Sequence, residues 1–258
     1  MNAPPLLTTT LQTLLNEERQ RTMDAQKRLG TIIPIAQQGL AILSTSVVSV
    51  SAHNGVIAAF MLAIQKSVTL AFLSYIRAHT AQAEFNCRQA IELTALAAYL
   101  LANPEVEILD NTDPENPTFP PTKKLAGKAY KWLEATEPEL NRFLKDFKDR
   151  INGSTAHASI YVTHLTVDID SLTGDGEMFT GSFFDNLSLN DTRAFLMSLC
   201  RLIVLIMETI RRANEKSQGL GLKNGLEQEI DLYAKLVDGY QKALGEVMHQ
   251  ERNSAASA

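Results

Sequence analysis

No Asp, Glu, Lys or Arg occurs between Leu29 and Gln65, and a polar break at residues 53–55 divides this run into two apolar halves. Two explanations are open. The halves could cross a membrane as a hairpin whose basic flanks lie on the same side. They could instead be buried helices of a water-soluble bundle. We favour the buried helices because Pro34 and several polar residues interrupt the first half, while Gln65 and Lys66 fall within the second.

Apolar residues recur at helical spacing along most of the chain. The clearest case is residues 55–77, where Phe60, Ile64, Val68 and Phe72 recur every four residues. The predicted helices cover residues 8–29, 31–52 with a kink or late start near Pro34, 55–77, 80–102, 122–150 with a break near Pro138, 191–212 and 226–249. We expect residues 55–77, 80–102 and 191–212 to form the centre of the molecule.

The period changes from helical to alternating over residues 161–186. Side chains alternate before and after Gly174-Asp175-Gly176, a sequence typical of a tight turn, which predicts a β-hairpin. Residues 103–121 hold five prolines and five acidic residues, as expected of an exposed loop. The fold class predicted is therefore all-α: a multi-helix bundle with a small β-hairpin insertion, in one domain spanning residues 1–258 and ending in a frayed tail at 250–258.

The composition narrows the compartment and the partners. The net charge of -5 and pI near 5.6 disfavour a large non-specific phosphate-binding surface but leave room for a local basic cleft. Cys87 and Cys200 each lie in an apolar stretch, so we expect two buried thiols and no disulfide framework. With no secretory signal pattern in the first residues, a cytoplasmic protein is expected, outside the membrane.

Arg88 and Glu92 lie one helical turn apart on an otherwise apolar helix. At this spacing their side chains can meet. Charges on such a face are costly unless they are paired. Two roles stay open: a structural ion pair that fixes the helix register, or a polar binding cluster that lines a cleft.

Arg150 and His157 form the candidate catalytic pair. Their separation of seven residues puts them on one face of a continuous helix. A guanidinium can hold phosphate oxygens and an imidazole can exchange a proton, which together suit cleavage of RNA through its 2′-hydroxyl. The alternative is a helix that ends at Asn152-Gly153, with His157 in a polar turn.

The remaining polar motifs predict no metal site and no cofactor. His164 follows His157 by seven residues, yet no acidic residue with metal-ligand spacing joins them. Asp168, Asp170 and Asp175 lack the glycine and glutamate of a calcium-binding EF-hand loop.

The stretch from Phe60 to Leu101 resembles a group of bacterial all-helical proteins. Their pattern is an Arg-x-x-x-Glu helix, here Arg88 to Glu92, and a later Ser/Thr-rich segment that ends in histidine, here Ser154 to His157. More distantly, the chain is similar to the HEPN helical superfamily. Many HEPN members are dimeric, metal-independent ribonucleases of toxin or phage-defence systems, and their Arg…His motif would correspond to Arg150 and His157.

Two functional hypotheses follow. The favoured one is a helical interaction or regulatory protein with an Arg/Glu/His cluster in its apolar bundle, and the alternative is a HEPN-like ribonuclease. Both predict self-association as a homodimer, for which the leftover helix faces in residues 8–29 and 226–249 are the candidate surfaces. RNA or another protein is the expected partner.

Overall fold

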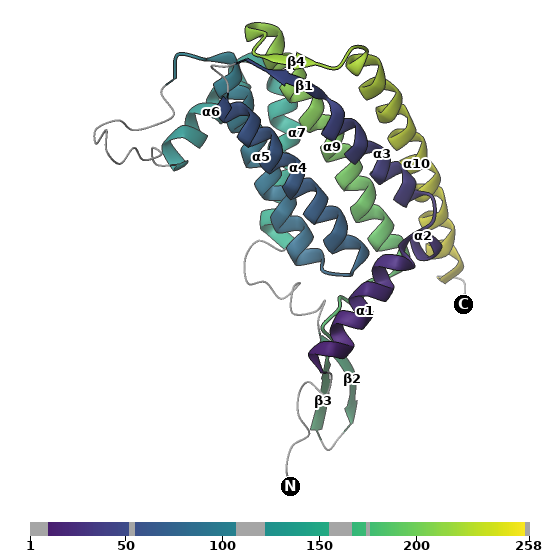
Figure 1. Cartoon of the computed structure of the whole chain (residues 1–258). Coiled ribbons are helices and arrows are strands. Elements are labelled where there is room, and N and C mark those ends of the chain that lie inside the picture. The colour runs from purple at the N-terminus through teal and green to yellow at the C-terminus, as the bar shows by residue number, and fades with distance from the viewer. Residues whose placement is uncertain (1–9, 52–54, 107–121, 155–166, 174–175, 256–258) are drawn as a thin grey trace.

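The computed structural model describes residues 10–51, 55–106, 122–154, 167–173 and 176–255. The elements are α1 (Leu11–Met23), α2 (Ala25–Leu29), α3 (Ile32–Thr45), β1 (Val47–Val50), α4 (Gly55–Ile76), α5 (Thr80–Ala102), α6 (Thr122–Thr136), α7 (Pro138–Ser154), β2 (Val167–Thr173), β3 (Gly176–Gly181), α9 (Leu189–Ser217), β4 (Leu220–Leu222) and α10 (Leu226–Ala255). The architecture is a helical bundle with small antiparallel β elements, which confirms the predicted fold class (Figure 1).

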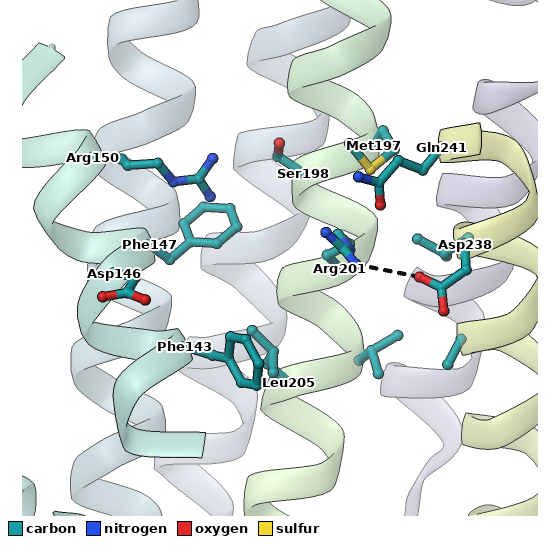
Figure 2. A pocket seen from close by; sticks show the side chains of 13 residues that line it. Phe143, Asp146, Phe147, Arg150, Met197, Ser198, Arg201, Leu205, Asp238 and Gln241 are labelled. Carbon is teal, nitrogen blue, oxygen red and sulfur yellow. Dashed lines mark hydrogen bonds and ion pairs between the residues drawn. The ribbon is translucent and has the colours of Figure 1, made fainter. Parts of the chain in front are cut away.

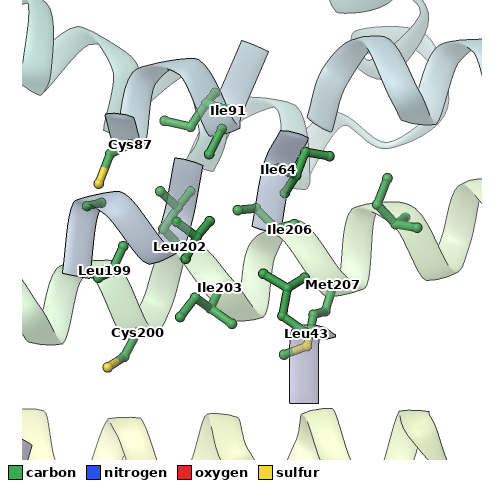
Figure 3. Close-up of a cluster of buried hydrophobic side chains, with 14 of the residues drawn as sticks. Leu43, Ile64, Cys87, Ile91, Leu199, Cys200, Leu202, Ile203, Ile206 and Met207 are labelled. Carbon is green, nitrogen blue, oxygen red and sulfur yellow. The ribbon is translucent and has the colours of Figure 1, made fainter. Parts of the chain in front are cut away.

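The long helix α9 runs through the middle of the bundle and packs against α3, α4, α5, α7 and α10. Its apolar side chains Leu199, Ile203 and Ile206 are fully buried. Figure 3 shows them among side chains from other helices, including Ile64 of α4 and Ile91 of α5. Since burial of one such side chain stabilises the fold by roughly 1.5–3 kcal/mol, this layer supplies much of the driving force.

The charge-free stretch forms α3 and α4, and both belong to the core. Ile32, Leu43 and Ile64 are buried in the same cluster as the α9 side chains. By length and composition, α4 is the one helix among the described residues that could span a membrane. One side of α4 packs against α5 and α9, while Leu62 on its other side is 66% exposed.

A two-stranded sheet replaces the end of the helix predicted over 31–52. After Thr45 the chain extends into β1, which pairs antiparallel with β4, with Val47 opposite Leu222 and Val50 opposite Leu220. The β-branched Val47-Val48 favours a strand, and a partner distant in sequence supplies the hydrogen bonds. That partner strand lies in the glycine-rich stretch between α9 and α10.

The predicted hairpin is present, and its second strand ends at Gly181. β2 pairs with β3 in antiparallel register, with Val167 opposite Gly181 and Thr173 opposite Gly176. Residues 161–166 and the turn residues 174–175 lie outside the described part of the chain.

Several helix ends differ from the prediction. The helix expected over 8–29 is interrupted at Asp24, giving α1 and α2; Thr10 caps α1 and Gly30, at a φ of 73°, ends α2. The break at Pro138 is confirmed. At the other end of the chain, the helix predicted to stop at 249 continues to Ala255, so most of the predicted tail is helical.

Candidate functional site

Arg88 and Glu92 meet, as their spacing predicts. The Arg88 Nε lies 3.3 Å from Glu92 Oε1, and both side chains are partly exposed. Lys148 of α7 adds a second cation, with its Nζ 2.9 Å from the same oxygen. The ion pair therefore connects α5 to α7, which is the arrangement expected of a structural link.

The charges around Glu92 set its ionisation. Partial burial raises the pKa of its carboxyl, but the hydrogen bonds and charges of Lys148 and Arg88 outweigh burial and leave the pKa below the usual value. Lys148 also lies 5.0 Å from the ring centre of Tyr130 on α6. A carboxylate held by two cations remains charged at neutral pH, so Glu92 is a fixed anion within this cluster and a poor candidate for a proton donor.

Arg150 lies in an unbroken part of α7, because the helix continues through Asn152 and Gly153 to Ser154. The helix therefore continues past Asn152-Gly153, where the alternative interpretation placed its end. The Arg150 guanidinium lies 4.6 Å from the ring centre of Phe147, one turn earlier. His157 and His164 lie outside the described residues, so the pairing of Arg150 with His157 stays a prediction.

A groove lies over α9 between α7 and α10, and we call it the α9 groove. Its volume is about 460 Å³. The lining residues are Phe143, Asp146, Phe147 and Arg150 of α7, Met197, Ser198, Arg201, Val204 and Leu205 of α9, and Ala234, Val237, Asp238 and Gln241 of α10. Figure 2 shows Arg201 on the floor, between Phe147 and Phe143 on one side and Asp238 and Gln241 on the other.

Arg201 is the single charge between Arg193 and Glu208 in α9. Its guanidinium reaches Asp238 Oδ1 at 3.4 Å, and the two side chains are 50% and 67% exposed. Glu92 therefore does not take part in this pair: its own partners are Arg88 and Lys148. The Arg201–Asp238 ion pair is solvent-exposed and weak, so a ligand group can replace the water bound to either side chain.

Among the residues that the structure describes, neither Arg88 nor Glu92 lines the α9 groove. On α7, Lys148 and Arg150 project in different directions, since residues two apart lie about 200° apart around a helix. The two predicted sites are thus separate: one is an ion cluster between α5 and α7, and the other is the groove that contains Arg150.

Two features of the groove could have been read in the sequence. Phe143, Phe147 and Arg150 recur at helical spacing, and Arg201 stands alone in an apolar helix. What the sequence does not contain is the distance between α7 and α10, which leaves α9 uncovered.

No group of three or more metal-ligating side chains occurs in the described part of the chain. Of the three predicted loop aspartates, Asp175 lies outside the described residues. Comparisons with protein-family models, with curated proteins and with solved structures found no match.

Proposed function

We propose that this protein is a helical interaction protein that binds an amphipathic α-helix of a partner protein in the α9 groove. The observation that carries the proposal is an apolar floor with a lone arginine, left uncovered between two flanking helices. A helix in a hydrophobic groove is a common mode of recognition between proteins.

The dimensions suit two turns of helix. From Met197 to Leu205 the floor follows eight residues of α9, which corresponds to about 12 Å at 1.5 Å per residue. A ligand helix lying over α9 would have α7 on one side and α10 on the other, because side chains of both helices line the groove.

The chemistry of the lining defines the ligand. Met197, Val204 and Leu205 offer an apolar floor, and Phe143 is an exposed aromatic anchor on the wall. Arg201 in the middle and Arg150 on the rim favour carboxylates on the ligand, at positions away from Asp146 and Asp238, which line the same groove. We therefore expect a ligand helix with apolar residues four and seven positions apart and acidic residues beside them.

A designed peptide tests this proposal. The probe is a fluorescein-labelled, hydrocarbon-stapled helix with leucines at positions i, i+4 and i+7 and flanking glutamates, and its control carries lysines in place of the glutamates. We expect the glutamate peptide to bind with clearly higher affinity in fluorescence anisotropy. Phe143→Glu should weaken this binding by about tenfold or more, equivalent to 1.4 kcal/mol.

Leu232→Glu is the matched control, since Leu232 is an exposed apolar residue of α10 that does not line the groove. Its affinity for the peptide should equal that of the wild type. Equal binding to the wild type and to Phe143→Glu, or equal affinity for the two peptides, would contradict the proposal.

A ribonuclease is the second candidate, and one observation favours it. Arg150 is exposed on the groove wall, where a phosphate can approach its guanidinium. If Arg150 and His157 cleave RNA, then Arg150→Ala and His157→Ala should each remove cleavage of a short single-stranded RNA without lowering the melting temperature. Equal cleavage rates in the wild type and both variants would eliminate this activity.

A further inference from the structure

α10 carries an exposed apolar stripe. Leu232 is 65% exposed, Leu236 41% and Val247 43%, and Ala243 between them is exposed as well. At 100° per residue these four side chains fall within about 60° of one another around the helix, over about 22 Å of its length. We call them the α10 stripe. α10 lies at the edge of the bundle, where a second molecule can approach it (Figure 1).

The α10 stripe faces away from the α9 groove. Ala234 and Gln241 are α10 residues that line the groove. Both lie roughly 160–180° around the helix from Ala243 in the stripe. A molecule bound to the stripe therefore leaves the groove open.

We propose that the α10 stripe binds the same stripe of a second copy of this chain, with the two helices antiparallel. In the register that we propose, Leu236 lies opposite Ala243 of the second copy and Leu232 lies opposite Val247. A twofold axis relates the two copies, so each contact occurs twice and the assembly closes as a homodimer. Of the two surfaces that the sequence predicts for self-association, this is the one in residues 226–249.

The sizes of the side chains favour the antiparallel order. In this register each leucine meets a smaller side chain, so the two stripes fill each other's gaps. A parallel pair in register would place Leu236 against Leu236 and Ala243 against Ala243, which leaves the contact crowded at one level and empty at the next. Small side chains at the contact also let helix axes approach to about 8 Å.

The charges beside the stripe favour the same order. Lys235 and Glu246 are exposed and lie within about 20° of each other around the helix, on one flank of the stripe. A twofold axis across an antiparallel pair brings this flank of both helices together. Lys235 then lies about 3 Å along the axis from Glu246 of the second copy, and the dimer contains two such pairs. Lys242 is turned roughly 110° from the middle of the stripe, outside the contact.

Lys235 and Glu246 are available for this role. In the part of the chain that the structure describes, the α10 side chains that form ion pairs within their own chain are Glu227, Glu229 and Asp238. Exposed ion pairs contribute little affinity each, so the apolar stripe supplies most of the binding and the charges select the antiparallel order.

Cysteine cross-linking of the full chain tests the register. Leu236→Cys protein incubated with Ala243→Cys protein under mild oxidation should form a disulfide-linked dimer that contains one copy of each. Each variant alone should cross-link far less, because two copies of the same position lie about 10.5 Å apart along the helix axes, too far for a disulfide. Cys87 and Cys200 are buried and do not compete.

Gly245→Cys is the matched control for Ala243→Cys. Gly245 is a small exposed residue of α10 on the other side of the helix. Its mixture with Leu236→Cys protein should remain unlinked. No cross-link between Leu236→Cys and Ala243→Cys, or the same yield in every sample, would overturn the proposal.

Charge reversal tests the ion pairs in sedimentation velocity. Lys235→Glu and Glu246→Lys should each weaken dimerisation several-fold, because each change brings like charges together twice in the dimer. The double variant restores opposite charges and should dimerise as the wild type does. A double variant as weak as the single variants would show that the two positions do not meet, which contradicts the proposed register.

Two further variants separate the dimer from the α9 groove. Leu232→Glu should weaken dimerisation by about tenfold or more and bind the stapled glutamate peptide as the wild type does, whereas Phe143→Glu should dimerise normally. Unchanged dimerisation of Leu232→Glu, loss of the dimer in Phe143→Glu, or a wild type that stays monomeric over the whole concentration series would overturn the proposal. Failure of the peptide to bind would refute only the proposed function, because the stripe and the groove lie on different sides of α10.

Discussion

The contact between Gly39 of α3 and Tyr233 of α10 gives the sharpest test of the packing. A Cβ atom at position 39 would overlap the hydroxyl and two ring carbons of Tyr233. The Tyr233 ring is completely buried, so it cannot swing into solvent to relieve the overlap. Gly39→Ala should therefore force α3 and α10 apart.

The expected change in the free energy of unfolding of Gly39→Ala is the sum of two opposing effects. In a helix interior, alanine is more favourable than glycine by about 1 kcal/mol. Overpacking a buried site costs typically 1–3 kcal/mol, and an overlap with three atoms of a rigid ring belongs at the upper end. We expect Gly39→Ala to lower the free energy of unfolding by about 2 kcal/mol, or the melting temperature by roughly 4–8 °C for a chain of this length.

Gly239→Ala is the matched control. It makes the same substitution inside α10, where an added Cβ meets no atom within 4 Å. Thermal and urea unfolding of the two variants should give shifts of opposite sign, because only the helix propensity acts at position 239. If Gly39→Ala were as stable as Gly239→Ala, the close packing of α3 on α10 would be refuted.

A second substitution, Tyr233→Phe, tests the contribution of the Tyr233 hydroxyl alone. Among the described residues the buried Tyr233 hydroxyl has no oxygen or nitrogen partner, and the weak Cys200 thiol lies near it. Tyr233→Phe should thus be neutral or stabilising by up to about 1 kcal/mol. In combination with Gly39→Ala it should recover part of the lost stability, and a strictly additive double-mutant cycle would contradict the overlap.

Three further predictions concern thiols, charge and a backbone clamp. Burial raises the pKa of the Cys200 thiol to about 11 and that of the Cys87 thiol to about 12. A thiol reagent at pH 8 should therefore react with both cysteines only after the protein is denatured. Fast reaction with the native protein would contradict the burial of these thiols. The pKa of Glu92 is lowered in the folded state, so the ionised carboxylate stabilises the fold above pH 4.5, and this stabilisation is lost as the pH falls through the folded pKa. Glu92→Gln should therefore lower the melting temperature at pH 7 and have little effect at pH 3. The Asn214 side chain accepts a hydrogen bond from the Leu220 amide at 2.8 Å and donates one to the Leu220 carbonyl at 2.9 Å. Asn214→Ala should therefore lower the free energy of unfolding, measured with urea, by about 2–3 kcal/mol. An unchanged free energy of unfolding would show that water replaces these two hydrogen bonds.

The sequence predicted most of the helices because a helix is determined largely by residues close together in the chain. The apolar period over 55–77 and the stop at Pro138 are set by neighbouring residues, and both agree with the structure. β1 was missed because its hydrogen bonds come from β4, about 170 residues later, and a run such as Val47-Val48 fits a buried helix as well as a strand.

The same distinction applies to the candidate site. Arg88 and Glu92 were predictable because one helical turn separates them, whereas the approach of Lys148 depends on how α7 is rotated against α5. The groove requires the relative positions of three helices, and only its separate components, such as the lone Arg201, can be recognised in the sequence.

Under the proposed function, Arg201 should decide which helices the α9 groove accepts. While the groove is open, the Arg201–Asp238 pair stays hydrated and costs little. A purely apolar ligand would cover this pair and remove its water, and the desolvation penalty would offset much of the gain from apolar contact. A ligand carboxylate compensates by giving Arg201 a second acceptor.

Replacing the glutamates of the stapled peptide by leucines should therefore weaken binding to the wild type, although the peptide becomes more hydrophobic. In Arg201→Met the preference should reverse, because the floor then lacks a charge; a leucine peptide that bound more tightly to the wild type would show that the groove selects by apolar contact alone.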